Sequence, residues 1–309
     1  MISENKIFFH LGNGERPVTA DIYLTDRCNN ACSYCNYTRY EKRHGDIMTI
    51  ADFKKYIDKL LFLGVQGVIL TGGGEPTVNP YFDKIIGYLE EISVPYGVNT
   101  NFNNYHDCHP FFLKVSLDGY NKESYYTRRG VDAYDRTIEN IKKFTKEKGN
   151  TKVGLQMLTL SEKDVGPFYE AHQNIDFDYM VFRPIESRNG SYYFDDKNAK
   201  EAESIIKAVD NLQKKDSRVS LNYKFRMLHE SKYADCPAHW SQLCVNPRGE
   251  VLYCCHKPNE IIGHILDDDI LEKHRAADFR AESCDAPCRL SGPNDAMRKI
   301  CHIKDRMFL

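Results

Sequence analysis

The hydrophobic positions in the first two thirds of the chain follow two alternating patterns. Short apolar runs bounded by Gly, Pro or Asn are typical of buried strands, while longer segments with apolar residues three or four positions apart are typical of helices. The runs predict strands at residues 18–24, 65–70, 96–99, 112–117, 152–160 and 178–182. The spaced segments predict helices at residues 49–63, 81–91, 134–146, 164–172 and 198–215. Strands and helices in alternation predict an α/β fold, a parallel sheet with helices packed outside it.

Three unusual loops directly follow the first three predicted strands. They hold the cysteines of residues 28–35, the glycines of residues 72–76 and the segment Asn-Thr-Asn at 99–101. Barrels of parallel strands gather their chemistry at the carboxyl ends of the strands. We therefore expect the three loops to form one shared site.

The cysteine loop has the spacing C-x3-C-x2-C at Cys28, Cys32 and Cys35. A loop this short brings three thiolates onto one side, where they can hold one metal centre. Iron–sulfur clusters normally take four cysteines, so a cluster on these three keeps one iron open. A catalytic zinc site also keeps one position open. A zinc knuckle and unrelated thiols are the alternatives.

The glycine loop reads Gly-Gly-Gly-Glu-Pro at residues 72–76. Glycine has no Cβ, so a ligand can approach its backbone N–H and C=O groups closely. The loop lacks the Lys-Ser/Thr ending of a phosphate-binding Walker loop. A plain turn is the alternative, and the position one unit after the cysteine loop favours a ligand site.

The chain changes character from residue 235 onward, where Cys, Pro, Gly and His are frequent and long periodic segments are rare. Seven of the eleven cysteines lie between residues 236 and 301. In a reducing compartment such cysteines indicate metal clusters rather than disulfides. We therefore predict two domains, at 1–215 and 216–309, the second held together by metal. Residues 245–254 predict a β-hairpin with its turn at Pro-Arg-Gly, and the isolated Cys108 is predicted to be structural.

Composition is that of an ordinary globular protein, with 41% hydrophobic and 28% charged residues. A net charge of -2 and the absence of a dense Lys/Arg run argue against a nucleic-acid partner. The first twelve residues do not have the pattern of a signal peptide, and no apolar run is long enough to cross a membrane. We expect a cytoplasmic protein with no membrane partner.

The motif C-x3-C-x-Tyr-Cys followed by Gly-Gly-Gly-Glu-Pro resembles the radical S-adenosylmethionine (SAM) superfamily over residues 18–190. The resemblance implies a partial (β/α)6 TIM-like barrel with a 4Fe–4S cluster on Cys28, Cys32 and Cys35. It implies that SAM binds the fourth iron and is cleaved by one electron to methionine and a 5′-deoxyadenosyl radical, which abstracts a hydrogen atom. An electron donor such as flavodoxin or ferredoxin is implied as well.

The resemblance also assigns SAM contacts to residues of the strand-end loops. They are Tyr34 near the adenine, Gly73, Gly74 and Glu75 at the amino group, Ser116 and Asp118 at the ribose, and Arg183 at the carboxylate. A carboxylate suits the ribose because it accepts bonds from both hydroxyls, and a guanidinium suits a carboxylate because it can bind it in a bidentate way. The alternatives are a turn residue for Asp118 and a surface ion pair for Arg183.

The C-terminal region resembles the SPASM and twitch extensions of the same superfamily. Cys236, Gly249 and Cys254 fit the pattern that opens these extensions, while a further C-x2-C-x5-C run is absent. This favours the twitch type with one auxiliary 4Fe–4S cluster, with a structural zinc site as the alternative. The expected ligands are Cys236, Cys254, Cys284 and Cys288, with Cys244 competing for the place of Cys284.

The resemblance predicts a radical SAM oxidoreductase or epimerase that abstracts a hydrogen atom from a small polar substrate. Oxidation would follow if the auxiliary cluster takes an electron, and epimerisation if a cysteine returns a hydrogen, with Cys244, Cys255 and Cys301 as candidate donors. Only about seventeen residues precede the first strand, which favours a compact substrate. A maturase that modifies a ribosomal peptide is the alternative. A tRNA-modifying enzyme is disfavoured by the net charge of -2. A non-catalytic iron–sulfur protein is disfavoured because it would not explain the glycine loop.

Overall fold

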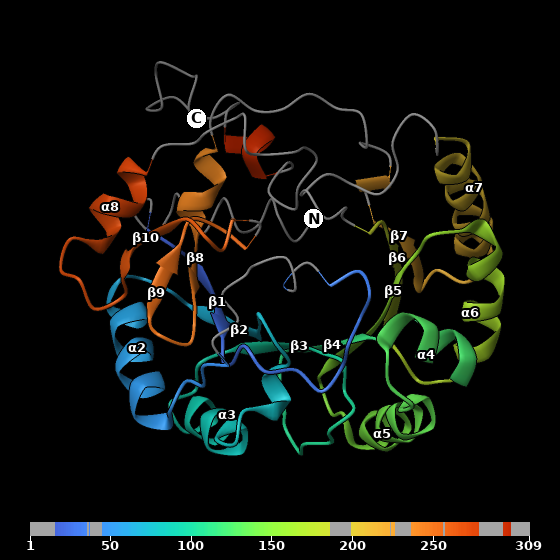
Figure 1. Cartoon of the computed structure of the whole chain (residues 1–309), viewed down its shortest axis with the longest axis horizontal. Coiled ribbons are helices and arrows are strands. Elements are labelled where there is room, and N and C mark those ends of the chain that lie inside the picture. The colour runs from blue at the N-terminus through green and yellow to red at the C-terminus, as the bar shows by residue number, and fades with distance from the viewer. Residues whose placement is uncertain are drawn as a thin grey trace.

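In the computed structural model, ten strands of the described residues form one curved sheet with helices along its outer side (Figure 1). The structure describes residues 16–35, 37, 45–185, 199–222, 224–225, 236–255, 257–277 and 293–297. The predicted parallel sheet is confirmed, because the first six strands pair in chain order and in parallel. They are β1 (Thr19–Tyr23), β2 (Gly67–Thr71), β3 (Tyr96–Thr100), β4 (Phe112–Ser116), β5 (Lys152–Leu158) and β6 (Tyr179–Arg183).

A seventh parallel strand, β7 (Val219–Leu221), pairs with β6 and was not predicted. It is only three residues long and lies among charged residues, so it carries little apolar pattern. β7 extends the sheet at the edge opposite the C-terminal strands.

All five predicted helices are present, as α2 (Ile50–Phe62), α3 (Phe82–Glu91), α5 (Tyr134–Glu147), α6 (Val165–His172) and α7 (Ala199–Lys215). α2 begins where predicted, because the Thr49 side chain accepts a hydrogen bond from the Asp52 N–H at 3.1 Å. A Thr cap satisfies one of the donors that a helix start leaves unpaired. Short 3-10 turns occur at Pro76–Val78 (η2), Glu162–Asp164 (η3) and Pro237–Ser241 (η5).

Two helices were missed, α8 (Ile270–Ala276) and α4 (Lys122–Arg129), of which α4 lies beside the cysteine loop. The only buried residues of α4 are Tyr125 and Arg129, so it shows no apolar stripe. Local capping specifies it instead. Asn121 and Ser124 form a reciprocal capping box at its start, and Gly130 ends it with φ +70°.

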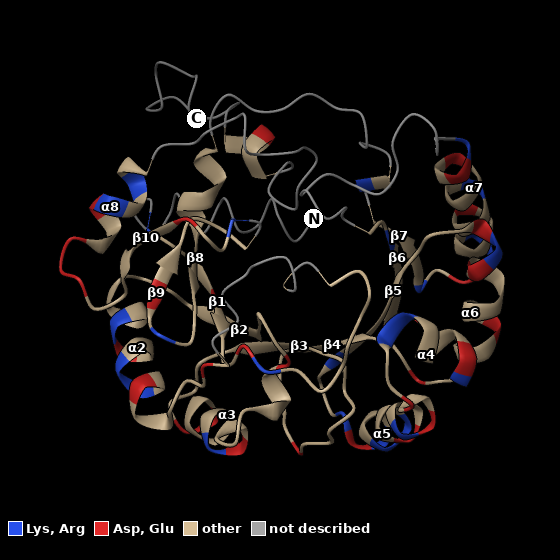
Figure 2. Cartoon of the chain, in the orientation of Figure 1, with Lys and Arg blue, Asp and Glu red and all other residues tan. Residues whose placement is uncertain are grey.

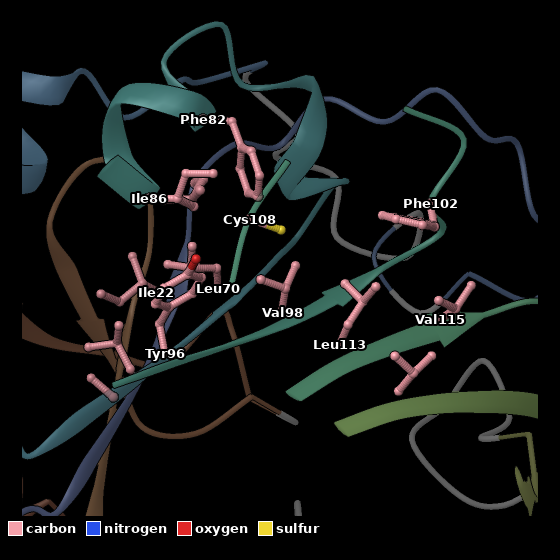
Figure 3. Packing of buried hydrophobic residues seen from close by; sticks show 14 of the residues in the cluster. Ile22, Leu70, Phe82, Ile86, Tyr96, Val98, Phe102, Cys108, Leu113 and Val115 are labelled. Atoms are coloured by element: carbon pink, nitrogen blue, oxygen red, sulfur yellow. The ribbon is translucent and has the colours of Figure 1, made fainter. Parts of the chain in front are cut away.

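The core lies between the sheet and the helices, and alternate residues of each strand enter it (Figure 3). Val98, Leu113 and Val115 face the same apolar layer as Phe82 and Ile86 of α3. Because strand side chains alternate between faces, the residues in between lie on the concave face. That set includes the polar residues Asp21, Asn99, Lys114, Ser116, Gln156 and Arg183, together with apolar residues such as Ile69 and Val181.

The C-terminal strands join the same sheet at β1. β8 (Gln242–Val245) pairs with β1 in parallel, and β9 (Glu250–Leu252) and β10 (Ile261–His264) follow antiparallel, before α8 (Ile270–Ala276). The predicted hairpin is confirmed, with Gly249 at φ +80° in its turn. Cys254 lies just beyond β9 rather than within it. The domain boundary between residues 215 and 216 stays a prediction.

Lys, Arg, Asp and Glu are mixed along the helices that cover the sheet (Figure 2). Among the described residues, no helix combines the length and apolar character that a membrane span requires.

Candidate functional site

The cysteine loop follows β1 directly. Cys28 is exposed, Cys32 and Cys35 are half-buried, and the described cysteines are thiols rather than disulfides. The loop is folded tightly by a 3.2 Å bond from the Cys35 N–H to the Cys32 carbonyl and a 3.4 Å contact between the Asn30 N–H and the Cys28 Sγ. Three thiols in one short, accessible loop are the donor set that an iron–sulfur cluster takes.

The surroundings of two thiols of this loop shift their pKa. Although Cys28 is exposed as a residue, desolvation of its thiol raises its pKa to about 11. Desolvation also raises the pKa of Cys32, on which Arg129 acts in the opposite direction. No three His, Cys, Asp or Glu side chains among the described residues are placed to hold one metal ion. A zinc knuckle needs all its ligands on one ion, whereas each iron of a cluster takes its own thiolate. Three thiols on one short loop fit a cluster, in which each thiolate binds a separate iron.

The loop after β3 holds the cysteine loop through asparagine side chains. The Asn101 Nδ2 donates to the Asn29 Oδ1 at 2.7 Å, and the Asn103 Nδ2 donates to the Asn30 Oδ1 at 2.6 Å. The sequence placed residues 99–101 at the site, and this part of the prediction matches the structure. Asn103 was missed, because only a contact across the fold reveals it.

The glycine loop packs against the residues just before Cys28. The Gly74 N–H donates to the Thr25 carbonyl at 3.0 Å, and the Glu75 N–H donates to the Arg27 carbonyl at 2.8 Å. A Cβ on Gly74 would collide with the Arg27 backbone, and one on Gly73 would meet the Tyr37 ring. The lack of side chains thus allows this close contact between loops, and the predicted approach of SAM to Gly73 and Gly74 stays a prediction.

Glu75 is buried and joins the ends of β2 and β3. Its Oε1 accepts bonds from the Thr77 N–H at 3.2 Å, the Thr77 hydroxyl at 2.7 Å and the Thr100 hydroxyl at 2.5 Å. Its Oε2 accepts a bond from the Asn101 N–H at 2.6 Å. Burial raises the pKa of Glu75, and these hydrogen bonds act in the opposite direction. Glu75 positions the loop that holds Asn29, while its contact with the SAM amino group stays a prediction.

Asp118 is fully buried, with φ +57°, at the turn after β4. Its Oδ2 accepts a 2.7 Å bond from the Tyr34 hydroxyl and lies 2.8 Å from the Arg129 Nη2. Its Oδ1 accepts a 2.7 Å bond from the Leu158 N–H. Both oxygens are therefore engaged within the chain, and the structure brings together the predicted residues Tyr34 and Asp118. The ribose and adenine contacts of Asp118, Ser116 and Tyr34 stay predictions.

Arg129 is a site residue that the sequence reasoning missed. Its guanidinium is buried, with the Nη1 3.4 Å from the Cys32 Sγ and the Nη2 donating to the Ser116 carbonyl. The Gly130 that ends α4 was the only local signal, and it gave no indication of a contact with Cys32.

Arg183 ends β6 and is half-buried on the concave face. The prediction placed Arg183 just after the sixth strand, whereas the structure makes it the last residue of β6. Its Nη1 lies 3.4 Å from the Gln156 Oε1 on β5. A carboxylate-binding role for Arg183 stays a prediction.

The C-terminal cysteines fall into two environments. The buried Cys236 accepts a 3.2 Å bond from the Asn294 Nδ2, and Cys254 is also buried. Cys244 packs with Tyr23 and Leu252, and the half-buried Cys255 packs against that cluster. Cys284, Cys288 and Cys301 lie outside the described residues, so the ligand set and the candidate hydrogen donors stay predictions.

Cys108 belongs to the main core and is 4% exposed. Burial raises its pKa to about 12. The prediction of a structural role is confirmed by this position, beside Phe82 in Figure 3.

The chain matches two family profiles. The profile of the radical SAM superfamily matches residues 22–171, and that of SPASM, an iron–sulfur cluster-binding domain, matches residues 236–292. These segments contain the cysteine loop, the glycine loop and all the C-terminal cysteines except Cys301.

Curated relatives have different activities. GTP 3′,8-cyclase of Peptoclostridium acidaminophilum is 28% identical over 230 residues, covering 68% of this chain and 69% of the relative. The antilisterial bacteriocin subtilosin biosynthesis protein AlbA of Bacillus subtilis is 25% identical over 275 residues, covering 82% of this chain and 58% of the relative. The mycofactocin maturase MftC of Mycobacterium tuberculosis is 29% identical over 143 residues, covering 41% of this chain and 35% of the relative.

Solved structures share the fold. The protein anSMEcpe with bound AdoMet and the Cp18Cys peptide superposes with a TM-score of 0.64 at 19% identity, covering 89% of this chain and 86% of that one. Streptococcus suis SuiB bound to its precursor peptide SuiA superposes with a TM-score of 0.59 at 15% identity, covering 82% and 63%.

Proposed function

This chain belongs to the radical SAM superfamily and carries a C-terminal SPASM-type iron–sulfur domain, and from this premise we propose that it modifies a peptide by hydrogen abstraction. Its cofactors are SAM, a SAM-binding 4Fe–4S cluster and auxiliary iron–sulfur binding. Two further statements are our proposal: the substrate is a peptide, and the C-terminal domain binds a single auxiliary cluster.

The chemistry rests on one observation, the loop with three thiols at the carboxyl end of β1, packed against the glycine loop. Cys28, Cys32 and Cys35 would hold the cluster, which with SAM supplies a one-electron route to hydrogen abstraction. The chain's own residues fix the loop from two sides, through Asn101 and Arg129. The polar residues of the concave face beside it can orient a substrate through hydrogen bonds.

The choice of a peptide rests on the relatives. AlbA and MftC are named for bacteriocin biosynthesis and for mycofactocin maturation, and two fold neighbours are solved with peptides. These names support the maturase alternative better than the small polar substrate that the sequence favoured. Only part of AlbA and SuiB is spanned by this chain, so the substrate remains our proposal.

The outcome after hydrogen abstraction is also a proposal. Oxidation requires that the auxiliary cluster accept an electron, and epimerisation requires a thiol donor such as Cys244 or Cys255. Turnover in deuterated water separates the two, because only epimerisation leaves one deuterium on the product carbon.

The test is SAM cleavage by reduced, reconstituted protein under anaerobic conditions. We expect 5′-deoxyadenosine to form, and its rate to rise with short peptides encoded beside the gene. Two 4Fe–4S clusters predict about eight iron atoms per chain. The matched control replaces Cys28, Cys32 and Cys35 with Ala and should retain about four iron atoms without cleavage.

Two results would contradict the proposal. Iron-loaded protein that forms no 5′-deoxyadenosine would exclude the radical chemistry. Consumption of GTP, with no response to any peptide, would instead favour the nucleotide chemistry for which the GTP 3′,8-cyclase relative is named.

A further inference from the structure

Arg129 places a buried positive charge beside the cysteine loop. We propose that Arg129 is a positioning residue that docks this loop on α4 and raises the reduction potential of the cluster bound there. The inference rests on cluster binding at Cys32 and is independent of the peptide substrate.

Arg129 contacts two consecutive residues of the loop. Its backbone carbonyl accepts a 2.9 Å bond from the Ala31 N–H, and its Nη1 lies 3.4 Å from the Cys32 Sγ. Gly130, in the left-handed conformation, lets the loop come close, since a Cβ there would lie 2.6 Å from the Ala31 carbonyl oxygen. The end of α4 therefore fixes both the backbone and the second thiol of the loop.

The position of the guanidinium is itself fixed by its neighbours. Its Nη2 pairs with the Asp118 Oδ2 at 2.8 Å and donates to the Ser116 carbonyl. Asp118 is held in turn by the Tyr34 hydroxyl and the Leu158 N–H. Arg129 is thus the middle of a chain of contacts that runs from β5 through Asp118 to Cys32.

Among the described residues, one donor of the guanidinium has no hydrogen-bond acceptor. The Nε of Arg129 is buried and has no hydrogen-bond partner among the described residues. A buried donor without a partner destabilises the fold, and such groups in native proteins call for an explanation. The explanation offered here is that the guanidinium is placed beside Cys32 for its positive charge.

The expected effect on the cluster follows from charge. Reduction adds one negative charge to the cluster, and both nearby charge and hydrogen bonds to its sulfur atoms set its potential. Arginine stays protonated in proteins, so its charge persists at every working pH. Removing that charge should make reduction less favourable.

The experiment compares three variants of the full-length, iron-loaded protein by redox titration followed by electron paramagnetic resonance, with dithionite as the reductant. The cluster is identified as the signal that changes when SAM is added. Arg129→Gln should lower the equilibrium constant for reduction at least tenfold, which is 59 mV for one electron. Arg129→Lys keeps the positive charge, so its equilibrium constant for reduction should fall by a smaller factor.

The matched control is the neighbouring arginine. Arg128 pairs with Asp164 at 2.6 Å and donates to the Leu158 carbonyl, and none of its contacts among the described residues is with the loop. Arg128→Gln should therefore leave the potential unchanged. An Arg129→Gln protein with full iron content and an unchanged potential would overturn the inference.

A further variant keeps the test decisive if Arg129→Gln does not fold. Asp118→Asn retains the shape of the carboxylate but removes the charge that offsets Arg129, so the potential should shift upward, opposite to Arg129→Gln. A downward shift, or none, contradicts the proposed role. These titrations contain no peptide, so failure of the peptide proposal does not affect them.

Discussion

At the residue scale, the strand-end site is built from polar side chains whose hydrogen bonds go mainly to one another. Glu75, Asp118 and Asn103 are nearly or fully buried, and each joins two loops. Buried polar groups of this kind stabilise a fold only when their bonds are complete. Their substitution should therefore affect both stability and the site.

Glu75→Gln tests this network. Glutamine replaces one acceptor oxygen by a donor, which would face the N–H or hydroxyl donors of Thr77, Thr100 or Asn101. We expect the free energy of unfolding to fall by about 2 kcal/mol, measured by urea unfolding followed by circular dichroism. The control Glu91→Gln changes an exposed residue of α3 and should stay within about 0.5 kcal/mol. Equal stability of the two variants would exclude a network role for Glu75.

His172 provides a test of pH dependence. Burial lowers its pKa to about 4 from 6.5, and its two ring nitrogens lie against the Phe168 carbonyl and the Tyr134 hydroxyl. Between these values the unfolded chain binds a proton that the folded chain does not. Stability from His172 is therefore full above pH 6.5 and is lost as the pH falls toward 4.

Urea unfolding at pH 7.5 and 5.5 measures this contribution. From pH 7.5 to pH 5.5, the free energy of unfolding of the wild type should fall by about 1 kcal/mol more than that of His172→Gln. The same loss in both proteins would show that His172 is protonated in the folded state at pH 5.5.

At the element scale, α4 shows how a helix without an apolar stripe can still position a site. Its capping box and its terminal Gly130 define it locally, and its last residue reaches Cys32. Helix prediction from periodicity misses such elements, because their burial comes from single polar side chains. The β3 loop is a similar case, since Asn103 acts through a bond to Asn30.

Gly130→Ala tests the docking of the cysteine loop on α4. The substitution strains a backbone at φ +70° and places a Cβ against the Ala31 carbonyl. Gly149 also has a positive φ, +54°, but nothing lies within 4 Å of its Cβ position, so Gly149→Ala is the matched control. Backbone strain alone should lower the free energy of unfolding of each of the two variants by about 1–2 kcal/mol.

Iron content distinguishes the two glycine variants. Only Gly130→Ala should also bind less iron after reconstitution, because only there does the new methyl group displace the loop that carries Cys28 and Cys32. Iron loss in both variants, or in neither, would show that the contact with Ala31 does not position the loop.

At the scale of the whole molecule, the C-terminal region is part of the same sheet as the barrel. β8 lies parallel to β1, and Arg248 in the β8–β9 turn pairs with Asp46 at 2.5 Å. The Tyr56 hydroxyl of α2 also donates to the Arg248 carbonyl at 3.3 Å. The strand that precedes the cysteine loop is therefore held on one side by β2 and on the other by the C-terminal segment.

A chain truncated after residue 225 should lose this support. It would leave β1 as an exposed edge strand with unpaired N–H and C=O groups, which promotes aggregation. We expect it to aggregate or to unfold at a lower urea concentration than the full chain, as seen by size-exclusion chromatography and circular dichroism. A soluble monomer with unchanged stability would instead mean that the two regions fold independently.

The sequence alone determined the periodic elements and the identity of the chemistry. Strand and helix patterns depend on local spacing, and the cysteine and glycine motifs carry their function within a few residues. The six βα units and the loops at Cys28–Cys35 and Gly72–Pro76 were therefore predictable. The tertiary structure alone decided what supports them: Asn103 lies 73 residues from Asn30, and Arg129 lies 97 from Cys32. Residues this far apart in the sequence come into contact only once the sheet has brought the ends of its strands together. No local sequence pattern therefore predicts these contacts.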